Sequence, residues 1–453
     1  MIYSIACINY KEVFKEIYVK HNKENILDKS FEALKRGTFN ELQKYGSSHE
    51  AFPQEQSFCV TGTLLHDLIS ALSISNQISS LSEKETKILK NTSEFVATNI
   101  ESHANIGNHL LASLAGLIKF SKYLETDNKI VLKGILDISE KLEKIWHEEG
   151  WLEEYGGADI GYLSLSLQYL FEIDEAYFPN RNSWINSIMK FTTNFFHLDG
   201  SIGNNYGSRG SSLIYPAAFL QSDEKNIFNF YIESFERKKI PNHNDLDDSN
   251  FVPFINSLIT GLVKAREPKS EQIALPIHKE KYIKLFKDAG FLIVINNNSQ
   301  KILDLNMSGQ EAHFTESGSF RTGVFTIQKS NNKIFCALNS KFSIIENDSG
   351  ITISLFSKFY EVNTKPLNTK ELIGSRLLIP FFKLFPSMLK IVKNIAVKKF
   401  FLLGKPVGEY KKVIEVFDYE ISLEEAASYP NSFKKVDKFI HHPIKMASQN
   451  YLN

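Results

Sequence analysis

The chain has 453 residues, of which 43% are hydrophobic and 23% are charged. This length exceeds what one ordinary hydrophobic core requires and predicts two domains. Lys plus Arg and Asp plus Glu number 52 each, so no overall charge favours nucleic acid, and any charged partner must be recognised locally.

The first residues, "MIYSIACINYKEVFKEIYVKHNKEN", contain no basic region followed by an apolar core and a small-residue cleavage site. No window offers about 18 uninterrupted apolar residues. The sequence therefore predicts neither a secretory signal nor a transmembrane helix, and by default a cytoplasmic or membrane-peripheral protein. Three widely spaced cysteines in apolar settings form no disulfide or zinc pattern. We expect Cys7, Cys59 and Cys336 to be small buried residues.

Residues 1–268 read as successive helices, with apolar residues at three- and four-residue steps and breaks at Gly, Asn, Pro or Asp. More charged helices separate the most apolar ones, at intervals of roughly 50 residues. This alternation predicts an incomplete α/α toroid of helical hairpins, in which a buried inner ring is covered by amphipathic outer helices. The most apolar helices are predicted to begin near Gln56, Asn108, Tyr162 and Ser211, and again near Val252.

From about residue 285 the pattern changes to short β-branched or aromatic runs between Asn, Gly and Ser turns, such as "GFLIVINNN" and "GITISLFSKFYEV". Such runs predict the strands of an antiparallel β-sandwich. The charged stretch 263–272 is the predicted linker. The fold class is therefore α+β multidomain, with an α/α toroid over residues 1–268 and a β-sandwich over residues 269–453.

One segment of the second domain, residues 376–406, mixes large apolar side chains with seven basic residues. Its prolines and its frequent lysines exclude a membrane span. Two interpretations remain: packed secondary structure, or a basic apolar surface that makes peripheral contact with a membrane.

If the buried helices run parallel, their N-termini open at one end and the polar loops that precede them meet there. The free N–H groups and positive dipole ends of these helices favour a carboxylate or another anion. Asn108 and His109 open the second buried helix. Tyr162 opens the third, with Asp159 placed to cap it. Each of these residues also suits a purely structural role as a cap or a wall.

Two loops add further candidates. The stretch "HLDGSIGNNYGSRGSSLIYP" crowds His197, Tyr206 and Arg209 among glycines, and a long loop between two helices of a compact domain usually binds something. In "GWLEEYGG", Glu154 adjoins Tyr155, and an aromatic side chain beside a carboxylate suits a sugar ring. The structural alternatives are an ion-paired loop and a surface turn.

Other catalytic patterns are missing from the sequence, which has no P-loop, no dinucleotide-binding glycine motif, no HExxH and no Gly-x-Ser-x-Gly. Two carboxylate pairs could serve glycoside hydrolysis, and their spacing singles out neither. These pairs are Glu154 with Asp159 and Glu55 with Asp199.

The Asn-His pair that opens one helix, followed one hairpin later by a Tyr that opens another, resembles the heparinase II/III and alginate lyase group. The segment "GWLEEYGGADIGYLSLSLQYL" is similar to the family stretch in which an acidic run precedes the catalytic tyrosine. The resemblance implies an incomplete ring of helical hairpins followed by a β-sandwich. It also implies cleavage of an acidic, uronate-containing polysaccharide by β-elimination, without a metal or an organic cofactor.

The resemblance also implies roles for individual residues. Asn108 and His109 would bind and neutralise the uronate carboxylate, and Tyr162 would act as acid, base or both. Arg209 or Tyr206 would hold the neighbouring sugar or assist ionisation of the tyrosine. The family often uses a histidine from the sandwich, and His313 is the candidate here. The remaining candidates for substrate binding are Gln56, Glu154, Tyr155 and His197.

Three other functions suit the same scaffold. Returning a proton to C5 without cleavage would give a uronate epimerase, and a carboxylate pair would give a glycoside hydrolase. A chain that keeps these polar loops at one end of the helices but does not cleave would be a glycan-binding or polysaccharide assembly protein. The sequence does not separate these functions.

Overall fold

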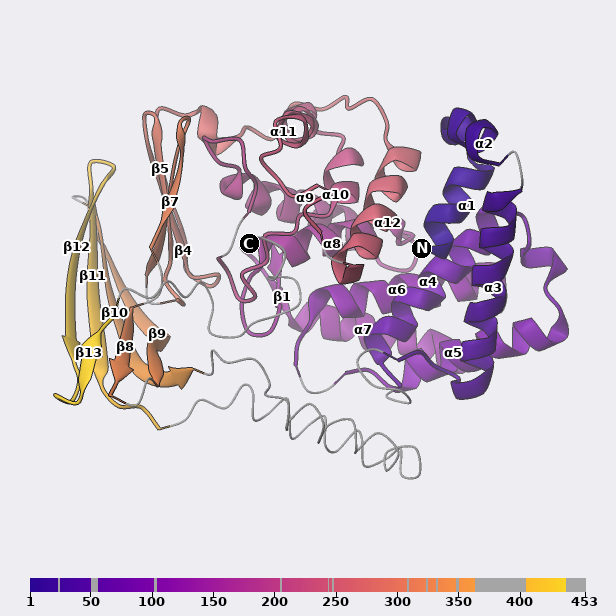
Figure 1. Ribbon diagram of the computed structural model, residues 1–453, viewed down its shortest axis with the longest axis horizontal. Coiled ribbons are helices and arrows are strands. Elements are labelled where there is room, and N and C mark those ends of the chain that lie inside the picture. The colour runs from indigo at the N-terminus through magenta and orange to yellow at the C-terminus, as the bar shows by residue number, and fades with distance from the viewer. Residues whose placement is uncertain are drawn as a thin grey trace.

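Helices form the first part of the molecule and antiparallel sheets form the rest, as the sequence predicts (Figure 1). The basic apolar segment predicted at 376–406 lies outside the described residues apart from its last two positions, as does Glu55. The computed structural model describes residues 1–22, 25–49, 56–101, 104–203, 206–242, 244–246, 248–307, 309–322, 325–330, 333–347, 350–362 and 405–436.

The helices begin close to the predicted positions. None of the helices in the described ranges is long and apolar enough to cross a membrane. In chain order they are α1 (Ile2–Tyr10), α2 (Lys15–His21), α3 (Ile26–Tyr45), α4 (Phe58–Ile74), α5 (Glu83–Thr98), α6 (Gly107–Tyr123), α7 (Lys129–Lys144), α8 (Ile160–Glu172), α9 (Arg181–Thr192), α10 (Pro216–Leu220), α11 (Lys225–Glu236) and α12 (Asp248–Lys264). Short 3-10 turns lie at Glu12–Phe14, Ile78–Ser80, Thr193–Phe195 and Pro276–His278.

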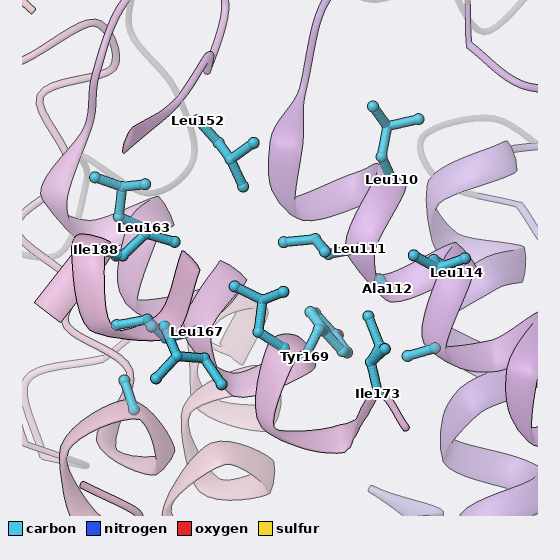
Figure 2. Close-up of a cluster of buried hydrophobic side chains, with 14 of the residues drawn as sticks. Leu110, Leu111, Ala112, Leu114, Leu152, Leu163, Leu167, Tyr169, Ile173 and Ile188 are labelled. Atoms are coloured by element: carbon cyan, nitrogen blue, oxygen red, sulfur yellow. The ribbon is translucent and has the colours of Figure 1, made fainter. Parts of the chain in front are cut away.

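Helix α6 is buried almost all round, because its leucines meet other helices and its small residues let those helices approach. Every residue from Leu110 to Ile118 is buried, and Leu111 of α6 points toward the side chains of α8 (Figure 2). A Cβ added at Gly116 would lie 3.0 Å from the carbonyl oxygen of Gly62 in α4. By contrast, α7 buries one stripe only, which leaves its other face to water.

The buried helices pack in sequence, α4 against α6, α6 against α8, α8 against α10, and α10 against α12. Helix α1 contacts both α4 and α12. The amphipathic helices lie outside this series, where α5 and α7 both pack on α6 and on each other. The alternation of buried and amphipathic helices in the sequence therefore corresponds to two sets of helices in space.

In the described part of the chain, the strands form two larger antiparallel sheets and one hairpin of two short strands. The five-stranded sheet has the order β3-β4-β5-β6-β7 and the six-stranded sheet the order β12-β11-β10-β9-β8-β13. The hairpin pairs β1 (Trp146–His147) with β2 (Trp151–Leu152). The other strands are β3 (Lys281–Phe286), β4 (Phe291–Asn296), β5 (Ser299–Asp304), β6 (Gln310–Thr315), β7 (Gly318–Arg321), β8 (Thr326–Lys329), β9 (Ile334–Asn347), β10 (Gly350–Val362), β11 (Glu409–Phe417), β12 (Glu420–Ser428) and β13 (Phe433–Lys435).

The five-stranded sheet lies between the helices and the six-stranded sheet (Figure 1). Strand β4 of this middle sheet is accordingly buried on both faces. Leu292 and Val294 belong to a core shared with β10 and β11 of the other sheet. Phe291 and Ile293 belong to the core of the helical part. Side chains alternate along a strand, so β4 joins two cores.

Polar contacts fix the sheet to the helical part. The Gln300 side chain of β5 donates to the carbonyl of Phe196 at 3.0 Å and accepts from the N–H of Leu198 at 3.2 Å. The Tyr282 hydroxyl donates to Asn194 at 2.7 Å. The Gly207 N–H donates to the Asp304 carboxylate at 2.9 Å.

Asp304 should make stability depend on pH. Burial raises the pKa of this carboxyl to about 6, against the opposing effect of backbone N–H donors such as that of Gly207. A carboxyl whose pKa is higher in the folded chain contributes stability at pH values below its unfolded pKa. That contribution is lost as the pH rises through the folded pKa.

We therefore expect the stability advantage of the wild type over Asp304→Asn to fall by on the order of 3 kcal/mol between pH 4 and pH 7. Urea unfolding of both proteins across this range measures the difference directly. A constant difference would show that Asp304 does not titrate in this window.

Candidate functional site

The start of α8 is tied to the long loop that follows α9. Asp159 caps α8 as predicted, since it accepts the Tyr162 N–H at 3.1 Å. Its other carboxylate oxygen accepts the N–H groups of Arg209 at 3.2 Å and Ser211 at 3.1 Å. Burial raises the pKa of Asp159 to about 6, although these N–H donors oppose that effect. This single buried carboxyl thereby places Arg209 beside Tyr162.

The start of α6 is held against the loop that precedes α8. Ile106 pairs with Glu154 in an isolated β-bridge, and the Gly107 N–H donates to the carbonyl of Glu153 at 3.0 Å. A side chain at Gly107 would place its Cβ 2.8 Å from the Cβ of Leu152, which explains the glycine. Asn108 lies inside the helix and does not cap it. Its amide donates to Glu154 at 2.8 Å.

Five residues from these segments form one cluster, which we call the arginine cluster. The Arg209 guanidinium donates to Glu154 at 3.0 Å, and Asn108 donates to the other carboxylate oxygen. The guanidinium carbon lies 4.2 Å from the ring centre of Tyr162 and 4.5 Å from that of Tyr155. Cation–π contacts on two rings hold the guanidinium in place. Asn108, Glu154 and Arg209 are buried, while Tyr155 and Tyr162 are half-buried.

Burial and charge pairing act in opposite directions on the pKa values of Glu154 and Arg209. Burial raises the pKa of Glu154, and the nearby Arg209 and His109 and the hydrogen bond from Asn108 only partly oppose it. For Arg209, burial lowers the pKa, but Tyr162 and Glu154 outweigh it and raise the pKa overall. Arg209 therefore stays cationic, and the pKa of Glu154 stays above its ordinary value. Chemically, the cluster places a positive charge over the ring of the half-buried Tyr162.

His109 lies next to the arginine cluster and has its own partners. Its Nδ1 atom is 2.9 Å from the carboxylate of Glu101, and the ring is also hydrogen-bonded to the thiol of Cys59. Burial lowers the pKa of His109, but Cys59 and Glu101 outweigh this and hold it well above its ordinary value. The His109 side chain keeps 14% of its surface exposed.

Sequence reasoning did not identify Cys59 and Glu101. Cys7 and Cys336 are buried as expected, but the expectation is wrong for Cys59, which is only partly buried. The missed signal was position, because Cys59 lies in the first turn of the first buried helix, where N–H groups favour a thiolate. Nothing in the sequence around Glu101 distinguishes it from other acidic loop residues.

His197 and Tyr206 lie elsewhere, at the contact between the helices and the five-stranded sheet. The two side chains are hydrogen-bonded at 2.7 Å, and the other ring nitrogen of His197 is 2.8 Å from the Ser201 hydroxyl. The His197 ring stacks on Phe314 with 3.7 Å between centroids. Burial, with a smaller effect of Arg321, pushes the pKa of His197 well below its ordinary value. Fully buried and neutral, His197 fixes the long loop to the sheet in this conformation.

Gln56 and His313 are not brought to the arginine cluster by the contacts of the described residues. Gln56 is exposed and donates to the carbonyl of Tyr45 at 3.3 Å. His313 lies 2.8 Å from the Ser299 hydroxyl. Its neighbour Phe314 faces the helices, so the alternation of β6 turns His313 to the opposite side of the sheet.

The carboxylate pair Glu154 and Asp159 is occupied by internal partners. Glu154 binds Asn108 and Arg209, and Asp159 accepts three backbone N–H groups. Within the described ranges, no group of three or more His, Cys, Asp or Glu side chains is arranged to hold a metal ion.

Comparison with known proteins adds no assignment, since no family model matches the chain and no curated protein gives a significant match.

Proposed function

We propose that this protein is a polysaccharide lyase of the heparinase II/III-like kind, which cleaves a uronate-containing glycan by β-elimination. One observation carries the proposal. At the starts of α6 and α8, Asn108 and Arg209 bind one buried carboxylate, that of Glu154, and the ring of Tyr162 packs against the Arg209 guanidinium.

The arrangement of the helices supports the same proposal. Helices α4, α6, α8, α10 and α12 pack in series, with α1 against both ends of the series. We interpret this series as the inner ring of a toroid of helical hairpins. We likewise interpret the two sheets that share one core as a β-sandwich. In this interpretation the arginine cluster lies at the end of the ring where buried helices begin.

The chemistry follows from the charges. A proton leaves C5 of a uronate only if the charge that develops on the carboxylate is stabilised, and Arg209 and Asn108 are placed to do this. In the free protein both residues bind Glu154, so the substrate carboxylate would replace Glu154 as their partner. Glu154 would then be protonated, which its raised pKa favours.

Tyr162 would carry the proton transfer. Its ionised hydroxyl would take the C5 proton, the electron pair would form the C4–C5 double bond, and the C4–O glycosidic bond would break. The departing oxygen would receive a proton, which Tyr162 can return when the geometry is syn. The Arg209 guanidinium, 4.2 Å from the Tyr162 ring, would stabilise the negative charge on the hydroxyl.

A screen of acidic polymers tests the proposal. Alginate, glycosaminoglycans and bacterial capsular polysaccharides are incubated with the protein, and the absorbance of the unsaturated uronate is followed. The proposal predicts that absorbance with at least one polymer. New reducing ends without unsaturation would indicate a hydrolase. Inversion at C5 without cleavage would indicate an epimerase, and binding without any reaction would indicate a glycan-binding protein.

One observation favours a second candidate function, a thiol-dependent hydrolase. Cys59, His109 and Glu101 form a chain in which a nucleophile, a base and an orienting acid are hydrogen-bonded in turn. The thiolate would attack the carbonyl carbon of an ester or amide, and the departing alcohol or amine would take a proton from His109. Water would then release the acid from the thioester.

Thiol alkylation separates this candidate from the lyase. If Cys59 is held as a thiolate, iodoacetamide should label it at least tenfold faster than Cys7, whose pKa burial raises to about 12. Peptide mass spectrometry measures both rates in one sample. Equal rates would exclude an activated thiol, and full lyase activity of Cys59→Ser would exclude a thiol step in elimination.

A further inference from the structure

A large cavity lies at the other end of the buried helices. Its volume is about 1240 Å³. Among its walls are the last residues of α4, α6 and α12 together with Phe171, next to the end of α8. It is therefore separate from the arginine cluster, which lies where α6 and α8 begin.

Among the charged side chains that line the cavity, most are cationic. Two acidic side chains, Asp223 and Glu267, also line it. The cationic side chains of the lining are Lys11, Lys119, Arg181, Lys264, Arg266 and Lys269.

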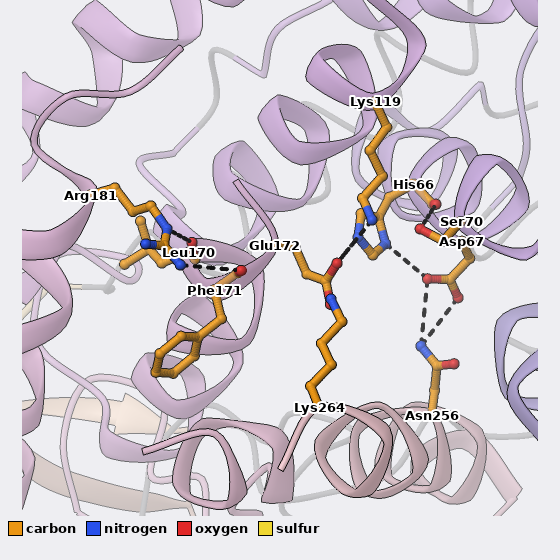
Figure 3. Close-up of polar contacts among 10 residues, drawn as sticks. All are labelled: His66, Asp67, Ser70, Lys119, Leu170, Phe171, Glu172, Arg181, Asn256 and Lys264. Atoms are coloured by element: carbon orange, nitrogen blue, oxygen red, sulfur yellow. Dashed lines mark hydrogen bonds and ion pairs between the residues drawn. The ribbon is translucent and has the colours of Figure 1, made fainter. Parts of the chain in front are cut away.

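The inner cations are held by a buried acid (Figure 3). Glu172, with 1% of its side chain exposed, pairs with Lys119 at 2.9 Å and with Lys264. Burial alone would raise the pKa of Glu172, but the two lysines outweigh it and hold the pKa well below its ordinary value. His66 Nε2 lies 3.8 Å from the same carboxylate. Glu172 therefore stays ionised and offsets one of the two lysine charges.

Arg181 binds carbonyl groups at the end of α8. Its guanidinium donates to the carbonyl of Leu170 at 2.9 Å and to that of Phe171 at 3.3 Å (Figure 3). Carbonyl groups at helix C-termini repel anions, and Arg181 offsets this effect at α8. The lining has six cationic and two acidic side chains. Counting the buried carboxylates of Glu172 and Asp67 as two further negative charges still leaves a net positive charge around the cavity.

The outer cations are exposed at the mouth of the cavity. Lys11 follows α1, and Arg266 and Lys269 follow α12. The backbone N–H of Lys269 donates to the Asp223 carboxylate at 3.2 Å, which fixes this segment beside α11. Deeper in the cavity, Tyr3 and Phe171 supply aromatic surface. Among the charged exposed residues of the lining, the three cations from two separate segments therefore outnumber the two acids, Asp223 and Glu267.

We propose that this cavity binds a small polyvalent anion, whose phosphate or carboxylate groups lie at the mouth between Arg266, Lys269 and Lys11. The buried Glu172 keeps such groups from the floor, so less charged parts of the ligand would point inward. The inference does not depend on lyase activity, because the arginine cluster contributes nothing to the cavity.

Isothermal titration calorimetry of the full chain tests the proposal, with inorganic pyrophosphate in one arm and citrate in the other. We expect saturable one-to-one binding of at least one probe. The double variant R266A/K269A should weaken it at least tenfold. The control K15A/K133A removes two exposed lysines elsewhere and should change it less than threefold.

Pyrophosphate binding alone would identify a phosphate ligand, and citrate binding alone a carboxylate ligand. No saturable binding of either probe, or an equal loss in both double variants, would overturn the proposal. Activity toward uronate polymers is measured on the same variants. Failure of the lyase proposal can then be told apart from failure of the cavity proposal.

Discussion

Tyr162→Phe is expected to lower the rate of unsaturated-uronate formation by roughly 10²–10⁴-fold, the usual contribution of a positioned acid or base. The substitution removes only the hydroxyl. The ring that lies 4.2 Å from the Arg209 guanidinium carbon remains, so the arginine cluster keeps its packing. Glycan affinity should therefore change little. Initial rates by absorbance and affinity by calorimetry measure the two effects separately.

Tyr155→Phe is the matched control, because Tyr155 contacts the same guanidinium at 4.5 Å and is also half-buried. We expect a loss of less than tenfold, since this hydroxyl has no part in the proton transfer. A Tyr162→Phe enzyme that retains turnover within tenfold of the wild type would rule out the role proposed for Tyr162.

Glu172→Gln is expected to cost about 3–5 kcal/mol of unfolding free energy, the usual effect of removing one partner of a buried ion pair. The change leaves Lys119, whose side chain is 14% exposed, without its carboxylate partner. Lys264 is 33% exposed and loses less, because water can solvate it. Urea unfolding at neutral pH measures the change.

Glu233→Gln provides the comparison for this prediction. Glu233 pairs with Arg237 at 3.7 Å on the surface of α11, with both side chains more than half exposed. Exposed pairs contribute about 0–1 kcal/mol, so this variant should stay close to the wild type. If Glu172→Gln unfolds within about 1 kcal/mol of Glu233→Gln, Glu172 does not hold the helix ends together.

The sequence predicts the elements well, because their signals are local. The apolar pattern after Gly107 and the cap at Asp159 mark the starts of α6 and α8 within a few residues. Short β-branched runs likewise mark β4 and β10. Periodicity of this kind depends on which face of each element is buried, and the local sequence records that.

Contacts between distant residues are harder to predict. Asn108 looks like a helix cap in sequence, yet it bonds Glu154 because the loop before α8 folds back along the start of α6. His197 looks like a binding residue among glycines, yet the sheet that follows buries it against Phe314. In both cases the deciding neighbour lies far along the chain, where no local pattern records it.

The basic cavity was missed for a related reason. Arg266 and Lys269 belong to the charged stretch 263–272, whose composition is typical of a linker. In the structure the hydroxyl of Ser270 donates to Glu224, which pins this stretch beside the cavity. Charge composition indicates exposure to water, and it does not indicate what the exposed side chains surround.

The central claim is elimination at the arginine cluster, and mass spectrometry of the products tests it most directly. Each elimination divides the polymer without adding water, so the account predicts that the masses of the two fragments sum to the mass of their parent. One of the fragments should carry an unsaturated uronate at its end. Fragments that together exceed the parent by one water per cleavage would contradict the account.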